Sequence, residues 1–128
     1  RNCNFLLRTH LTTGFKTQLP LCSYVTDIGS VWCELPLGKI CFTGGNEKAY
    51  EVTYIDTLRE FACTSKPCLI KERYAHAAAF HDNYLYVIGG RVGRTYLKDC
   101  ERFDVTLEKW EALEPLPQAC HTSSAIVL

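Results

Sequence analysis

The fold of this chain is decided by the stretch Tyr84-Leu85-Tyr86-Val87-Ile88-Gly89-Gly90. Aromatic and aliphatic residues fill it until it stops at two glycines, which is typical of a strand that runs into a tight backbone feature. The same design occurs once earlier, as Lys39-Ile40-Cys41-Phe42-Thr43-Gly44-Gly45. Gly44 and Gly89 are 45 positions apart. A period of that size indicates a protein built of repeats.

Further landmarks follow each glycine pair in the same order. A hydrophobic residue and an aspartate come first, at Ile55-Asp56 and at Phe103-Asp104, and a histidine follows, at His76 and His121. Turn signals divide each unit into four short hydrophobic segments, as expected of antiparallel strands. No segment has a convincing helical pattern. The sequence therefore predicts an all-β repeat architecture.

Composition and charge narrow the possible functions. The chain of 128 residues has as many lysines and arginines as aspartates and glutamates, so its formal net charge is zero. That balance argues against a surface for nucleic acid or anionic membrane, which would need clustered cations. No apolar run approaches the roughly 20 residues that a membrane helix needs. The chain contains no methionine, so we interpret it as an internal or processed piece, and we expect a cytoplasmic location.

Eight cysteines are scattered along the chain without a C-x-x-C pair, and several lie inside expected strands. This spacing favours reduced thiols, while disulfides and a zinc site stay open as alternatives. Cys63 and Cys68 are five positions apart, which suits neither common zinc spacing. The cysteines stand at positions 3, 22, 33, 41, 63, 68, 100 and 120.

The second unit resembles the Kelch repeat. That family has a strand with a histidine or small residues, a hydrophobic strand ending in Gly-Gly, an aromatic residue before an aspartate, and a tryptophan six or seven residues later. The matching residues are Arg73-Tyr74-Ala75-His76, then 84–90, then Arg102-Phe103-Asp104, then Lys109-Trp110. The first unit departs from the pattern, since Ile55 and Phe61 stand where the family usually has tyrosine and tryptophan.

The resemblance implies Kelch-type β-propeller blades of four antiparallel strands each. Because a propeller needs about 4–8 blades to close, we expect an incomplete propeller. Residues 1–22 would be the tail of an earlier blade, 23–72 and 73–117 two whole blades, and 118–128 the first strand of a further blade. Four alanines within residues 75–79 fit a strand crowded toward a central axis.

The glycine pairs and the repeated histidines are interpreted as structural. No Gly-Lys-Ser/Thr and no helix follows either pair, so neither is expected to cradle phosphate. His121 beside Ser123 or Ser124 lacks an orienting acid, so no catalytic residue is assigned. We predict no metal and no cofactor. The expected structural residues are Gly44, Gly45, Gly89, Gly90, His76, His121, Phe103 and Trp110.

The resemblance implies a scaffold that binds another protein or peptide. In Kelch propellers the contacts lie on loops after the Gly-Gly pair and before the histidine strand. Arginine recognises carboxylates through paired hydrogen bonds, so the partner is expected to be acidic, although each arginine could equally be a solvated loop charge. The candidate contact residues are Asn46, Lys48, Arg73, Tyr74, Arg91, Arg94 and Gln118.

Two further readings come from the family. Its members often serve as substrate receptors of ubiquitin ligases or bind actin. The alternative from another class is a propeller enzyme resembling galactose oxidase, which would need tyrosine, histidine and cysteine gathered in a metal site at the axis. The chain has these residue types without a convergent placement, so we predict that it is not an enzyme.

Overall fold

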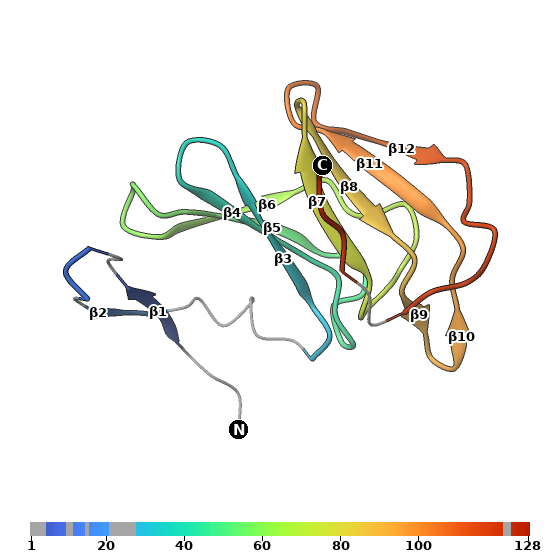
Figure 1. Ribbon diagram of the computed structural model, residues 1–128, viewed down its shortest axis with the longest axis horizontal. Helices are drawn as coiled ribbons and strands as arrows, with labels where there is room; N and C mark the ends of the chain where they lie inside the picture. The colour runs from blue at the N-terminus through green and yellow to red at the C-terminus, as the bar shows by residue number, and fades with distance from the viewer. Residues whose placement is uncertain (1–4, 10–11, 15, 21–27, 122–123) are drawn as a thin grey trace.

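The computed structural model describes residues 5–9, 12–14, 16–20, 28–121 and 124–128, and of these it gives no side-chain placement for 5–9 and 16–20. Every regular element in these residues is a β-strand (Figure 1). The all-β prediction is thereby confirmed. No helix in the described ranges is long and apolar enough to cross a membrane.

The first four-stranded sheet is antiparallel and keeps the order of the sequence, β3-β4-β5-β6. Its strands are β3 (Val31–Leu35), β4 (Lys39–Thr43), β5 (Val52–Asp56) and β6 (Ala62–Lys66). Asp56 starts the hairpin between β5 and β6. Its carboxylate accepts a hydrogen bond from the Leu58 amide at 2.9 Å. Asp is favoured there because its side chain can replace a backbone acceptor in a turn.

The second sheet repeats this arrangement as β7-β8-β11-β12, again antiparallel. Its strands are β7 (Ala77–His81), β8 (Tyr84–Ile88), β11 (Cys100–Asp104) and β12 (Lys109–Leu113). Two such sheets confirm the prediction of repeated four-stranded blades. We refer to β3–β6 as the first blade and to β7, β8, β11 and β12 as the second blade.

The turns of the second blade are tied to each other. Asp82 and Asn83, which join β7 to β8, both have positive φ, at 46° and 71°, as two-residue hairpins of the primed type require. The Asn83 amide donates to the Asp104 carboxylate at 3.1 Å. The same carboxylate accepts from the amides of Thr106 and Leu107, both at 2.9 Å. One aspartate therefore organises the β11–β12 turn and holds it against the β7–β8 turn.

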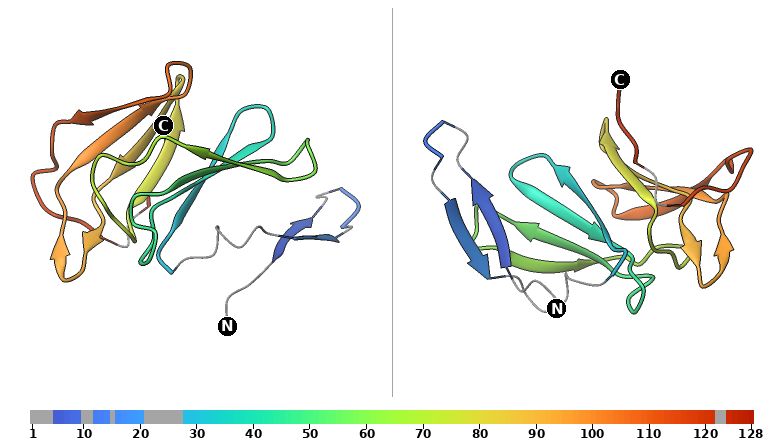
Figure 2. Two further views of the ribbon diagram at one scale, coloured as in Figure 1. Left: turned by 180° about the vertical axis from the view of Figure 1, so that it is seen from behind. Right: turned by 60° about the horizontal axis from the view of Figure 1, so that its bottom comes forward.

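The two blades meet face to face, with β3 beside β7 (Figures 1 and 2). The core between them combines residues from both sheets, and the Tyr54 and Phe103 rings meet edge to face at 6.4 Å. The alanine-rich β7 lies where the sheets come closest, as its small side chains predict. The buried residues of this core are Leu35, Cys41, Val52, Tyr54, Leu69, Leu85, Val87 and Phe103.

The described residues at the two ends of the chain lie outside the two four-stranded sheets. β1 (Phe5–Thr9) and β2 (Lys16–Pro20) pair as an antiparallel hairpin, on the side of the first blade away from the second (Figure 2). Their membership of an earlier blade stays a prediction. Residues 118–121 and 124–128 join no strand, and their membership of a further blade likewise stays a prediction.

The expectation of reduced thiols is wrong for one cysteine. Cys63, on β6, is disulfide-bonded. Five others are free thiols, and Cys3 and Cys22 lie outside the described residues. The spacing of cysteines in a sequence does not reveal which strands bring two of them together, so this bond was not predictable from it. The free thiols are Cys33, Cys41, Cys68, Cys100 and Cys120.

Candidate functional site

The two glycine pairs hold the end of each blade against the segment that follows the blade. A Cβ on Gly44 would lie 2.2 Å from the Arg73 carbonyl oxygen, and one on Gly89 would lie 2.6 Å from that of Cys120. Both glycines have φ +62°, where L side chains are strained. The amides of the second glycines donate to the same two carbonyls, at 3.2 and 2.7 Å. These contacts explain the repeated Gly-Gly as a backbone requirement.

Arg73 lies inside the protein. Its side chain is 0% exposed and pairs with the equally buried Glu101 carboxylate at 2.9 Å. The guanidinium also donates to the carbonyl oxygens of Gly89 and Asp99, at 2.7 and 2.8 Å. A buried charge needs such a complete set of partners. This enclosure does not fit the prediction that Arg73 contacts a partner protein, and we correct it to a structural role.

Glu101 clamps the segment that joins the two blades. Besides Arg73, its carboxylate accepts hydrogen bonds from the amides of Ile70 and Lys71, at 3.0 and 3.2 Å. The Lys71 ammonium adds an exposed ion pair with Asp99 at 2.9 Å. Sequence reasoning missed Glu101. The sequence has no clear signal for it, because β11 (Cys100–Asp104) also carries Arg102 and Asp104 and nothing in the run marks which charge is buried.

His76 and His121 occupy unlike surroundings in spite of their matching sequence positions. His76 is buried, and its Nε2 forms a 2.7 Å hydrogen bond with Oγ1 of Thr43. Burial and the nearby Arg73 charge lower the pKa of His76 to about 3, so the ring is neutral at neutral pH. His121 is partly exposed and stacks on the Tyr96 ring, with centroids 4.1 Å apart. The two histidines are therefore not equivalent in their surroundings, and the structural role predicted for each stays a prediction.

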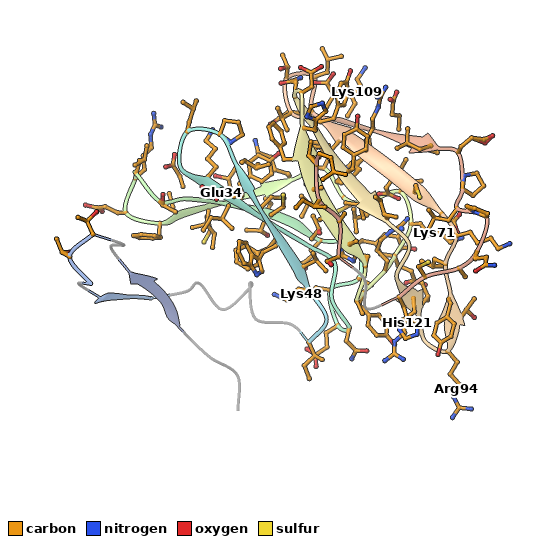
Figure 3. All side chains as sticks on the ribbon, in the orientation of Figure 1. Glu34, Lys48, Lys71, Arg94, Lys109 and His121 are labelled. Carbon is orange, nitrogen blue, oxygen red and sulfur yellow. The ribbon has the colours of Figure 1, made fainter. Side chains whose placement is uncertain are left out.

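The segment 91–98, predicted to be the loop that follows Gly89-Gly90, contains a short hairpin. β9 (Arg91–Val92) pairs with β10 (Thr95–Tyr96) across a two-residue turn. Gly93 has φ +56°, and glycine at the first central position is a common form of such turns. The turn places Arg94 at the tip of the hairpin, where it points away from the body of the protein (Figure 3).

Arg91 is fixed at the base of this hairpin by Tyr74. The two residues exchange backbone hydrogen bonds at 3.0 and 3.1 Å, and the Arg91 guanidinium lies 4.8 Å from the centre of the Tyr74 ring. The tyrosine hydroxyl donates to the Gly93 carbonyl at 3.0 Å. Nε of Arg91 is buried without a hydrogen-bond partner among the described residues. The arginine is thus oriented by the protein while part of its donor capacity is unused.

These contacts define a surface that we call the arginine rim. It lies at the end of the second blade where the chain leaves Gly89-Gly90 (Figure 3). Tyr96 is 50% exposed there, so an aromatic face is available beside the guanidinium groups. Arginine and aromatic residues are the types that most often carry binding energy in protein interfaces. The arginine rim consists of Tyr74, Arg91, Arg94, Tyr96 and His121.

The other predicted contact residues are placed less distinctly. Asn46 is exposed, and its backbone N–H donates a hydrogen bond to the Ile28 carbonyl at 2.9 Å. Lys48, in the same loop, forms an ion pair with Glu51 at 3.8 Å. Gln118 is exposed. These residues lie on loops, as expected, and the structure does not gather them into one cluster with the arginine rim.

No group of three or more histidine, cysteine, aspartate or glutamate side chains in the described residues is placed to hold a metal ion. The cysteines and histidines needed for a metal centre at the axis are therefore not brought together in this part of the chain. Nδ1 of His76 is buried without a hydrogen-bond partner among the described residues, and the nearby positive charge of Arg73 disfavours a metal cation there.

Comparison with known proteins relates the blades to one family. Residues 72–117 match the model of the Kelch motif. Over 101 residues the chain is 31% identical to Kelch-like protein 25 of Xenopus laevis and 30% identical to that of Xenopus tropicalis. Each alignment covers 69% of this chain and 17% of the relative, so the chain spans about a sixth of the length of the curated relatives it matches.

Solved structures share the fold at low sequence identity. The structure of YjhT superposes with a TM-score of 0.78 at 14% identity, covering 94% of this chain and 41% of that protein. A novel fungal alcohol oxidase of the AA5 family, in complex with copper, gives a TM-score of 0.66 at 16% identity, over 84% of this chain and 23% of that one. At these identities the likeness establishes the fold alone.

Proposed function

Since this chain belongs to the Kelch-repeat proteins and forms β-propeller blades, we propose that it binds another protein or peptide through the arginine rim. The observation that carries the proposal is the arrangement of Arg91 and Arg94 on one short hairpin. Arg91 is oriented by Tyr74 and keeps a buried donor unused, while Arg94 extends from the tip. Loops supported by a rigid scaffold are common sites of binding.

The chemistry of the rim favours an acidic partner segment. Two guanidinium groups offer forked donors that match carboxylates, and Tyr96 adds an exposed ring for apolar contact. A carboxylate on the partner would pair with the exposed Arg94 guanidinium and neutralise its charge. In a larger protein such a module would supply recognition, as in a substrate receptor of a ubiquitin ligase or in an actin-binding protein, and we offer both as the settings for this proposal.

Affinity capture tests the proposal. The full-length protein carrying these blades serves as bait, beside the double variant Arg91→Glu, Arg94→Glu and the control variant Lys109→Glu. Lys109 is exposed on β12, at the opposite end of the blade from Arg94 (Figure 3). We expect proteins captured by the wild type and the control to be lost with the double variant. Equal capture by all three baits would overturn the assignment of the rim.

The proposal is a binding role without catalysis, and the alternative is an oxidase built on the same fold. Titration of the full-length protein with copper, followed by spectroscopy and an alcohol oxidation assay, separates the two. Stoichiometric copper with oxidase activity would replace the binding proposal.

A cytoplasmic location is also part of the proposal. The disulfide at Cys63 weighs against it, because disulfides persist in oxidising compartments, and cell fractionation decides the matter.

A further inference from the structure

A polar cavity of about 180 Å³ lies against the outer ends of β4, β5 and β6, on the face that the first blade turns toward the second. The register explains its composition, because Lys39 pairs with Asp56 and Tyr54 pairs with Thr64 across neighbouring strands. Side chains of directly paired residues share one face of a sheet. The lining residues are Lys39, Tyr54, Asp56, Arg59, Ala62, Thr64 and Lys66.

Tyr54 brings an unsatisfied hydroxyl to this cavity. Its side chain is 8% exposed, and its ring packs edge to face on Phe103. The hydroxyl is buried and has no hydrogen-bond partner among the described residues. Burial, followed by the nearby Cys41 and Glu108, raises the pKa of the phenol. The group is therefore a neutral O–H donor, and leaving such a donor unpaired costs free energy.

The charges around this hydroxyl are mostly positive. The Lys66 ammonium lies 5.1 Å from the centre of the Tyr54 ring and forms an ion pair with Glu108 of the second blade. Arg59 approaches Asp56 only at 3.8 Å. Lys39 has no carboxylate partner within the described part of the chain. The three cations of the cavity therefore have two carboxylates, Asp56 and Glu108, as partners, and Lys39 is the cation left without a counter-ion among the described residues.

We propose that this cavity is a binding site for an oxyanion, a phosphate or carboxylate group, separate from the arginine rim. The Tyr54 hydroxyl would donate to an oxygen of the anion, and Lys39 and Lys66 would supply the charge. A donor and cations in a partly enclosed cavity favour a charged acceptor, since hydrogen bonds to ionised groups are stronger than neutral ones. A water molecule is the simpler occupant, and it would satisfy the hydroxyl without any dependence on Lys39.

Calorimetric titration of the full-length protein tests the proposal, with inorganic phosphate and with citrate, in chloride buffer at constant ionic strength. We expect saturable binding of at least one of them. Preference for phosphate would identify a phosphoryl group as the ligand, and preference for citrate would identify carboxylates. Tyr54→Phe removes only the hydroxyl and should weaken binding by about tenfold or more. Lys39→Gln should weaken it as well, whereas Lys109→Gln, at a residue that does not line the cavity, should not.

A thermal melt of each variant accompanies the titrations. Lys39 is only half-buried, so Lys39→Gln decides the outcome if Tyr54→Phe fails to fold. The proposal is overturned if neither anion binds saturably, which would leave water as the occupant. It is also overturned if both anions bind the Lys39 variant as tightly as the wild type, because the anion would then be held elsewhere.

Discussion

The indole N–H of Trp110 donates a hydrogen bond to the carbonyl oxygen of Pro67, with 2.8 Å between nitrogen and oxygen. Pro67 directly follows β6 of the first blade, whereas Trp110 lies on β12 of the second. The same indole packs on Phe103 with ring centroids 5.0 Å apart, and Phe103 in turn meets Tyr54. Three aromatic rings therefore join β5 of the first blade to β11 and β12 of the second.

Replacing Trp110 by alanine should destabilise this join. The indole is half-buried, so we expect a loss of about 2–4 kcal/mol in the free energy of unfolding, somewhat below the range for a fully buried tryptophan. Trp110→Phe keeps a ring but removes the donor to Pro67 and should cost about 1–2 kcal/mol. Denaturant unfolding of the full-length protein measures both. A loss under about 1 kcal/mol for the alanine variant would contradict the packing role.

Removal of one partner of the buried ion pair should be among the most damaging single changes. Arg73→Ala leaves the Glu101 carboxylate buried without its counter-ion, at a cost of about 3–5 kcal/mol. Lys71→Ala is the matched control, because it breaks the exposed Lys71–Asp99 pair, which contributes about 0–1 kcal/mol. Thermal or denaturant melts of the two variants should differ clearly. Similar losses for both would mean that the buried pair adds little to the fold.

The sequence was sufficient for the blade architecture because that information is local. Alternating strands, the aspartate-led turns and the glycine pairs each act within one unit, and all were predicted. The enclosure of Arg73 was not predictable in the same way. It depends on Glu101, 28 residues later in the chain, and no local pattern reveals which loop arginine finds a buried carboxylate. Arg91 and Arg94 were identified as candidates, but the hairpin that orients them was not foreseen.

His76 should make the stability of the protein depend on pH. Its pKa is lowered to about 3 in the folded state, while in the unfolded chain a histidine has a pKa of about 6.5. Below about pH 6.5 the unfolded state takes up a proton that the folded state refuses. The stabilisation is therefore complete above that pH and falls by up to about 1.4 kcal/mol per pH unit on the way down toward pH 3.

Urea unfolding at pH 7, 6 and 5 measures this dependence. His76→Gln keeps a polar side chain beside Thr43 but cannot titrate, so its stability should fall less steeply over the same interval. The difference between the two slopes isolates the histidine from the carboxylates, which titrate in both proteins. Parallel slopes for the wild type and the variant would show that His76 is protonated in the folded state.

The cysteines should differ in their reaction with an alkylating reagent. Cys68 and Cys120 are exposed thiols and should react in the folded protein, whereas Cys41 is buried and burial raises its pKa. Because the thiolate is the reactive form, Cys41 should react only after unfolding. Cys63 should need both unfolding and a reductant. Peptide mass mapping after each treatment reads out all four, and alkylation of Cys63 without reductant would contradict the disulfide.

The most direct test of the central claim is the affinity of the captured partner for the double variant Arg91→Glu, Arg94→Glu, measured by titration beside the wild type and Lys109→Glu. If each arginine makes a charge-assisted contact, binding should weaken by about 2–4 kcal/mol, which is roughly 30- to 1,000-fold. Arg91 is half-buried against Tyr74, so Arg94→Glu alone is measured beside the double variant, because that exposed substitution should alter stability by less than about 0.5 kcal/mol. An unchanged affinity in a folded double variant would contradict the account and leave both arginines as solvated charges.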